Sequence, residues 1–254
     1  MTLLYASPPF PTDRESPCAM TDTPDPAHEP AATSHVVPKI RGVALGMWQT
    51  NCYILSVPGG SDPKGCWIVD CGQKPQPLFA LIESAGLTPR GILLTHCHVD
   101  HIMGVDEALA KYGPMPILCH ALEREWNGDP MLNLSGFVGG MEVGVTLPTA
   151  TVADGQTLDL CGSSWKAMHV PGHSPGSLAY VHHASRQALS GDVLFAGGIG
   201  RFDFPGCDGL ALKRSLQVMM ALPDEMTIYP GHGPSTTIGR ERRTNPYVLR
   251  PGGW

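Results

Sequence analysis

The chain has 254 residues, of which 42% are hydrophobic and 16% charged, with 17 Lys and Arg against 23 Asp and Glu. This length and apolar content allow one large or two small domains with a buried core. A net charge of −6 argues against nucleic acid or an anionic membrane as the main partner, because both require a basic surface. No apolar run approaches the roughly 18 residues of a membrane span. Composition therefore excludes a coiled coil, a collagen, a disulfide miniprotein and a membrane protein.

The N-terminal region differs in composition from the rest. Residues 1–38 contain eight prolines and few large apolar side chains, so burial cannot offset the entropy of ordering them. We predict a disordered tail there, with Met20 as a second possible start, and neither a signal peptide nor a transit peptide. Residues 39–254 contain no repeat and no second linker, which predicts a single catalytic domain.

Cysteine usage indicates the compartment. The eight cysteines form no CxxC pair, and we expect no secretory leader before them. Small buried thiols are the simplest interpretation of such a pattern, and thiols persist in a reducing environment. The sequence therefore predicts a cytoplasmic location.

The hydrophobic pattern predicts strands and helices in alternation. Strands are expected where short apolar and β-branched runs lie between turn residues, and helices where apolar residues recur at i, i+3, i+4 and i+7. In chain order the predicted elements are strands at 51–57 and 66–70, a helix at 78–85, a strand at 91–95, a helix at 102–112, strands at 116–119, 165–170, 177–182 and 187–191, a helix at 209–221 and a strand at 226–229. Such a mixture predicts a layered α/β architecture in which helices cover the sheets.

The strongest chemical signal lies between the strand at 91–95 and the helix that follows it. There the chain carries His96, His98, Asp100 and His101. Alternate residues of an extended chain share a face, so the first three should point to one side, and the turn into the helix should redirect His101. Imidazole and carboxylate ligands suit Zn, Fe or Mn, and four of them exceed what one tetrahedral ion needs.

Three further polar residues follow predicted strands, each directly after a glycine. They are His173 in PGHSPG, Asp192 in SGD and His232 in PGHG. Glycine lets the backbone approach closely where a side chain must reach an ion, and strand-end loops are where catalytic residues usually gather. Together the three supply the ligands that a second metal ion would require.

The ordered set HxHxDH, PGHSPG, SGD and PGHG resembles the metallo-β-lactamase-fold hydrolases over about residues 39–250. Asn51-Cys52-Tyr53 and Asp70-Cys71-Gly72 also match early motifs of that superfamily. Residues 194–206, 230–235 and 243–247 are similar to the short, single-domain glyoxalase II-like branch. The resemblance implies an α/β fold of the four-layer αββα sandwich type.

The resemblance also implies roles for the seven residues. One metal ion would be held by His96, His98 and His173, the other by Asp100, His101 and His232, and Asp192 would bridge the two. Two divalent ions are implied, zinc being favoured and iron or manganese being alternatives. A hydroxide bridging them would attack a carbonyl while Asp100, as the catalytic residue, holds its proton and orientation. A thioester is the implied substrate, because a thiol of pKa about 8.5 leaves without a dedicated acid.

Some features depart from the full-length glyoxalase II pattern. Because 22 residues follow His232, we expect no C-terminal helical domain of the kind that helps those enzymes bind glutathione. Arg201 stands where the resemblance leads us to expect the Lys of a GCGKF-like loop, and it is predicted to bind a substrate carboxylate. A local salt bridge with Asp203 is an equal alternative. S-lactoylglutathione or a related acyl-thiol is the candidate substrate, and the oligomeric state is left open.

Other functions compete with this one. A mononuclear-iron persulfide dioxygenase of the same superfamily, using His96, His173 and Asp192, is the main alternative, because its GRTDF-type loop resembles GRFDF here. A true β-lactamase is disfavoured because those enzymes lack a counterpart of Asp192. Cys97 is expected to face away from the ions as a packed thiol. The remaining histidines are interpreted as tail or surface residues: His28, His35, His120, His169, His182 and His183.

Overall fold

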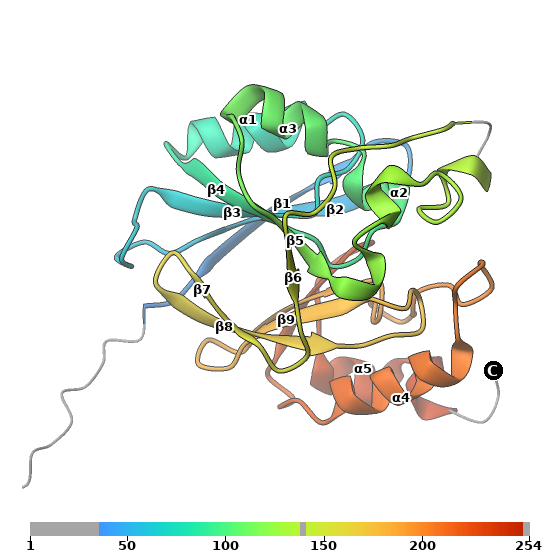
Figure 1. The fold of residues 1–254 in the computed structure, drawn as a ribbon. Coiled ribbons are helices and arrows are strands. Elements are labelled where there is room, and N and C mark those ends of the chain that lie inside the picture. Colours follow the sequence, from blue (N-terminus) through green and yellow to red (C-terminus); the bar gives the residue numbers. More distant parts are fainter. Residues whose placement is uncertain (1–35, 138–140, 251–254) are drawn as a thin grey trace, which may run out of the picture. The chain divides into compact units, whose positions relative to one another are not determined.

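The computed structural model describes residues 36–137 and 141–250. The predicted tail, residues 1–38, lies outside the described residues except for its last three. Within the described ranges, a pair of six-stranded sheets is stacked, with strand orders β1-β2-β3-β4-β5-β6 and β12-β11-β10-β9-β8-β7. Helices α1 and α3 lie on the outer side of the first sheet, and α4 and α5 lie on the outer side of the second (Figure 1). The predicted αββα sandwich is confirmed.

The first sheet is antiparallel at one edge and parallel elsewhere. Antiparallel pairing joins β1 to β2 and β2 to β3, whereas the strands from β3 to β6 pair in parallel. Parallel neighbours need a crossover, which α1 provides between β3 and β4 and α3 provides between β4 and β5 on the outer face (Figure 1). The bounds are β1 (Lys39–Leu45), β2 (Thr50–Ser56), β3 (Gly65–Val69), α1 (Gln76–Ser84), β4 (Thr88–Leu93), α2 (Val99–Ile102), α3 (Val105–Tyr112), β5 (Ile117–His120) and β6 (Ala150–Val152).

The second sheet is antiparallel except where β10 pairs with β11, and α4 forms the crossover between those two strands. Its elements are β7 (Thr157–Leu160), β8 (Ser163–His169), β9 (Leu178–His182), β10 (Gln187–Gly191), α4 (Gly209–Met220), β11 (Thr227–Pro230), β12 (Thr236–Thr237), α5 (Ile238–Thr244) and α6 (Pro246–Leu249). Single 3-10 turns occur at Ala121–Glu123, Trp126–Gly128 and Ser135–Phe137.

The apolar core follows the alternation of side chains along the strands. Ile54 and Ile68 belong to the cluster that also contains residues of α1 and α3, whereas their neighbours Leu55 and Val69 belong to the cluster around Trp165 between the sheets. Successive side chains of a strand point to opposite faces, so one strand serves both layers. A third cluster packs α4 against the second sheet. Strands buried on both faces explain why the sequence shows continuous apolar runs.

Several expectations are corrected by the structure. The helix expected at 102–112 is two helices, because the chain breaks at Gly104, where a Cβ would lie 2.4 Å from the carbonyl oxygen of Gly72. His182 is 6% exposed, so its assignment to the surface is wrong.

The seven described cysteines are free thiols, and all of them except Cys207 are buried. Among the described residues, none of the helices combines the length and apolarity that crossing a membrane requires.

Two tyrosines hydrogen-bond across the sandwich in opposite directions. Tyr180 of the second sheet donates to the carbonyl oxygen of Leu94, which follows β4, at 2.7 Å. Tyr53 of the first sheet donates to the carbonyl oxygen of Pro230 at the end of β11, also at 2.7 Å. Both acceptors lie at strand ends that precede candidate metal ligands. These bonds therefore tie the two sheets together where the site is built.

Replacing Tyr180 with Phe should lower the free energy of unfolding by about 1–3 kcal/mol, because a buried carbonyl loses its partner. Tyr112→Phe is the matched control, since its hydroxyl is half-buried and lies 3.5 Å from the carbonyl of Phe79. Denaturant unfolding of both variants measures the difference. A loss for Tyr180→Phe no larger than that for Tyr112→Phe would contradict the inference.

Candidate metal centre

The seven candidate ligands lie beyond the ends of four strands. His96 and His98 follow β4, Asp100 and His101 lie on α2, His173 follows β8, Asp192 follows β10 and His232 follows β11. Five of the seven are buried, whereas the side chains of Asp100 and His232 are 16% and 28% exposed. The structure thus brings together all seven residues that the sequence singled out.

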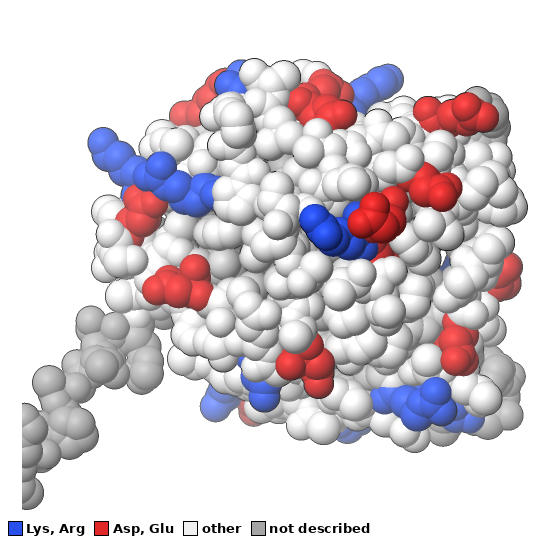
Figure 2. Space-filling view, in the orientation of Figure 1, with Lys and Arg blue, Asp and Glu red and all other residues white. Residues whose placement is uncertain are grey.

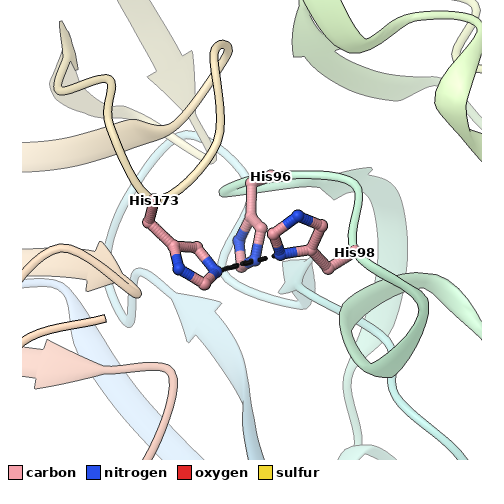
Figure 3. A group of neighbouring side chains, drawn as sticks. All are labelled: His96, His98 and His173. Atoms are coloured by element: carbon pink, nitrogen blue, oxygen red, sulfur yellow. Dashed lines mark hydrogen bonds between the residues drawn. The ribbon is translucent and has the colours of Figure 1, made fainter. Parts of the chain in front are cut away.

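Three histidines form the first group. The Nδ1 of His98 lies 2.9 Å from the Nε2 of His173, and that Nε2 lies 3.2 Å from the Nε2 of His96. Figure 3 shows the three rings converging, with His96 and His98 carried by one segment and His173 by a loop from the opposite side. One ligand atom from each residue lies within 4.8 Å of the others, which is close enough to share one ion.

Asp100, His101 and His232 form the second group. The Oδ2 of Asp100 lies 3.4 Å from the Nε2 of His101 and 3.2 Å from the Nε2 of His232. Asp192 lies between the two groups. Its Oδ1 is 3.5 Å from the Nε2 of His101, and its Oδ2 is 3.6 Å from the Nε2 of His173 and 3.4 Å from that of His232. This position is suited to a bridging carboxylate.

The local conformation of the HxHxDH segment differs from the expectation. The chain is extended as far as His98, but α2 begins at Val99, so Asp100 is helical and does not continue the alternation. One helical turn places Asp100 and His101 in the second group instead. Cys97 is buried in the core cluster of the first sheet, as expected for a packed thiol.

Hydrogen bonds on the far side of each ring identify the nitrogen that faces the centre. The Nδ1 of His173 lies 2.7 Å from the carbonyl oxygen of Arg201, which can only accept. The Nδ1 of His101 lies 2.9 Å from the carboxylate of Asp70. The Nδ1 of His96 lies 3.2 Å from the Oγ1 of Thr95, whose own hydrogen is donated to Asp70. We therefore assign the lone pair to Nε2 in all three rings, which is the tautomer that a metal ligand needs.

The pKa values of the histidines are shifted in opposite directions in the two groups of candidate ligands. Burial lowers the pKa of His98 to about 3 and that of His96 well below its usual value, so both are neutral at pH 7. Burial also disfavours charge on His232, but hydrogen bonds to Asp100 and Asp192 outweigh it and raise its pKa to about 9. Although burial opposes ionisation of Asp100 and Asp192, the neighbouring imidazole of His101 lowers the pKa of both. The two carboxylates therefore stay anionic at neutral pH.

Observations on the site itself indicate that it fits divalent ions. Within the described ranges, the Nε2 of His101 and the Oδ1 of Asp192 are buried and have no hydrogen-bond partner. The Nε2 atoms of His96 and His173 face each other at 3.2 Å, and two lone pairs at that distance repel unless a cation lies between them. A Cβ on Gly231 would lie 2.0 Å from the Oδ1 of Asp192, so glycine is needed for the backbone to pass. Histidine and carboxylate donors suit Zn, Fe and Mn.

Residues outside the ligand set orient it, and sequence reasoning did not assign them this role. Asp70 accepts hydrogen bonds from the backbone N–H of Thr95 at 2.8 Å and from its hydroxyl at 2.7 Å, besides contacting His101. Thr50 donates its hydroxyl to the Oδ2 of Asp100 at 2.8 Å. The available signal was the position of Asp70 as the last residue of the strand predicted at 66–70, close to where the candidate ligands lie relative to their own strands.

A cavity of about 630 Å³ opens beside the centre. Its described lining combines five of the seven candidate ligands with Arg201 and an apolar wall made of Trp48, Val99, Leu134, Phe137, Phe195, Ile199 and Phe204. The guanidinium of Arg201 makes two 2.9 Å bonds to Asp203 and lies 4.1 Å from the centre of the Phe204 ring. Arg201 thus lines the cavity and also forms the local ion pair with Asp203.

The surface in Figure 2 carries charged side chains singly or in small mixed groups, with uncharged surface between them. On this face no extended region of one sign is visible. A nucleic-acid site would need a continuous basic patch. This face does not provide one.

Several known proteins are similar to most of this chain. The model of the "Metallo-beta-lactamase superfamily" matches residues 45–232. Hydroxyacylglutathione hydrolase GloC of Haemophilus influenzae is 33% identical over 208 residues, covering 81% of this chain and 96% of that protein. Among solved structures, the BLEG-1 B3 metallo-beta-lactamase has a TM-score of 0.77 and 35% identity, covering 83% of this chain and 99% of its own. TTHA1623, solved in a di-iron-bound form, has a TM-score of 0.71 and 36% identity, covering 82% and 99%.

Asp192→Asn should weaken metal binding and lower turnover by more than about 100-fold. Asparagine lacks the negative charge that Asp192 places beside both groups of candidate ligands. Substitutions next to a metal ligand already lower metal affinity or activity by about 10–100-fold. Metal content after dialysis and the rate of hydrolysis with metal in excess measure the two effects. Asp159→Asn, on the exposed side of β7, is the control and should change neither. Full metal content with undiminished turnover in Asp192→Asn would remove Asp192 from the bridging role.

Proposed function

The chain belongs to the metallo-beta-lactamase superfamily, and we propose that within it the protein is a metal-dependent thioester hydrolase of the glyoxalase II-like type. The observation that carries the proposal is the position of Asp192 between two groups of three ligands. The likeness to hydroxyacylglutathione hydrolase GloC supports the choice of a thioester.

In this proposal His96, His98 and His173 hold one divalent ion, and Asp100, His101 and His232 hold the other, with Asp192 contacting both. When bound, such ions lower the pKa of water towards neutrality and polarise a carbonyl. We propose zinc, with iron or manganese as alternatives because the donor set suits all three. The di-iron form of TTHA1623 makes iron the first alternative to test.

Asp100 is proposed as the residue that holds and orients the proton of the attacking water. Its carboxylate lines the cavity and is partly exposed. Thr50 and His232 contact its Oδ2, which fixes the orientation of the group. Because its pKa is lowered, the carboxylate is available at neutral pH as a hydrogen-bond acceptor.

The lining of the cavity favours a thioester over an amide. Among the described lining residues, the titratable side chains are members of the ligand set, apart from Arg201. No separate acid is therefore positioned there for an amine leaving group. A thiol, with a pKa of about 8.5, departs as the anion without one. The aromatic and aliphatic wall would contact the acyl group or the thiol carrier.

The proposed partner is a small-molecule thioester, with S-lactoylglutathione as one candidate, and neither nucleic acid nor a membrane is needed for activity. We also propose that the protein works in the cytoplasm. The free state of the seven described cysteines agrees with a reducing compartment.

The first test is metal analysis combined with a substrate panel. Protein reconstituted with Zn, Fe or Mn should bind about two equivalents, as the two groups of ligands require, and should hydrolyse S-lactoylglutathione or an acyl-thioester of a smaller thiol. Removing the metal with a chelator should abolish turnover. One equivalent of iron with oxygen-dependent consumption of glutathione persulfide would favour the dioxygenase. Preferential hydrolysis of a cephalosporin would favour the chemistry named for BLEG-1.

Arg201→Ala tests the proposed contact with a substrate carboxylate. A hydrogen bond to a charged group contributes about 1.5–3 kcal/mol, so KM for S-lactoylglutathione should rise about 10- to 150-fold. KM for the neutral N-acetylcysteamine thioester of the same acid should not change. Arg186→Ala removes another exposed ion pair, to Glu225, and serves as the control. Equal KM changes for the two substrates would leave Arg201 with its local pairing to Asp203 as its role.

A further inference from the structure

Glu123 is a buried carboxylate outside the ligand set. It ends the 3-10 turn after β5 and is fully buried. Its Oε2 accepts the backbone N–H of Cys97 at 2.7 Å, and its Oε1 accepts the backbone N–H of Gly176 at 2.6 Å. Within residues 36–137 and 141–250 it forms no ion pair with Lys or Arg. Leaving a charge in the interior is costly, so these two N–H groups and the side chain of Ser174 must compensate for it.

The two N–H donors belong to the two segments that build the three-histidine group. Cys97 lies between His96 and His98, and Gly176 lies three residues after His173. The first segment follows a strand of the first sheet, and the second connects β8 to β9 of the second sheet. One side chain thus joins both sheets at the point where the rings of His98 and His173 meet at 2.9 Å.

The close approach of Glu123 depends on glycine. A Cβ at position 176 would lie 2.8 Å from the Cγ of Glu123 and 3.0 Å from its Oε1. Burial raises the pKa of Glu123, whereas hydrogen bonds from Ser174, Gly176 and Cys97 act in the opposite direction. The loop around His173 is therefore shaped to receive this carboxylate.

We propose that Glu123 is a positioning residue for the three-histidine half of the metal centre. It holds the segment of His96 and His98 against the loop of His173, so that their nitrogens meet at one point. The Asp100, His101 and His232 half is held by other contacts, including that between Asp70 and His101. This inference rests on the metal centre assigned under the proposed function.

The test is the metal affinity of Glu123→Gln, measured by competition with a chelator using Zn²⁺ alone. Glutamine keeps the volume, but its amide NH₂ would face one of the two N–H donors, so one bond is lost. Removing a contact that orients a ligand typically costs about 10–100-fold in affinity. We expect that loss for one of the two bound equivalents, with the other unchanged.

Glu241→Gln is the matched control. Glu241 is also fully buried and accepts a backbone N–H, that of Gly197 at 2.7 Å. Its other partners are Thr236, Asn245 and the guanidinium of Arg240 at 4.0 Å, and none of the four lies within two residues of a candidate ligand. This control should lower the melting temperature without changing either metal affinity. Glu123→Asp keeps the charge on a shorter side chain and replaces Glu123→Gln if that variant does not fold; the same loss at one equivalent is expected.

The outcomes separate the proposal from its alternatives. Equal weakening of both equivalents, unchanged affinities or the same loss in Glu241→Gln would each overturn it. If the wild type binds a single ion, the variant must bind that ion with lower affinity, or the proposal fails. Two ions without thioester hydrolysis would refute the proposed function and leave the role of Glu123 standing. Thioester hydrolysis by Glu123→Gln with unchanged metal affinities would support the proposed function and refute the role of Glu123.

Discussion

The candidate metal centre depends on the contacts that the carboxylate of Asp70 makes with Thr95 and His101. That carboxylate lies at the end of β3 and contacts the Nδ1 of His101 directly, at 2.9 Å. It also accepts the hydroxyl of Thr95, which in turn lies 3.2 Å from the Nδ1 of His96. His96 lies with His98 and His173, His101 lies with Asp100 and His232, and both also lie close to Asp192. Neither is among the described residues that line the cavity. One buried carboxylate therefore orients a ligand of each group from the side away from the substrate, which fixes the separation of the two groups.

Hydrogen bonds from protein groups compensate for the burial of this carboxylate and of that of Glu123, in a way that suits a metal centre. Asp70 and Glu123 receive hydrogen bonds from backbone N–H groups and neutral side chains, and neither is paired with Lys or Arg among the described residues. A buried lysine or arginine would neutralise the carboxylate and place a positive charge beside the ions. Backbone N–H donors compensate for desolvation without doing so. Compensation by N–H donors therefore keeps the negative charge of the two carboxylates close to the candidate metal centre.

Sequence reasoning could find most of the strands and the residues that the structure brings together as candidate ligands, because both leave local signals. Apolar runs predicted most strands, and the HxHxDH segment carries four ligands within six residues. It could not find Glu123 or Thr50, because their partners are 26 to 53 residues away and become neighbours only when the chain folds. It placed Asp100 in extended chain because nothing local announces a helix of one turn at Val99. Strands β1, β6, β7 and β12 were not predicted, and the two residues of β12 are too few to show any periodicity.

The division between ligands and cavity wall explains how one centre can serve different substrates. GloC and BLEG-1 are similar to this chain to nearly the same degree, 33% and 35% identical, yet their names specify different reactions. A shared centre cannot choose between a thioester and a β-lactam, because water activation and carbonyl polarisation serve both. The choice must come from residues that contact the substrate outside the centre. In this chain the aromatic residues Trp48, Phe137, Phe195 and Phe204 line the cavity together with Arg201, outside the candidate ligands. They lie on connections between strands, which can change while the sheets and Asp70 hold the candidate ligands in place.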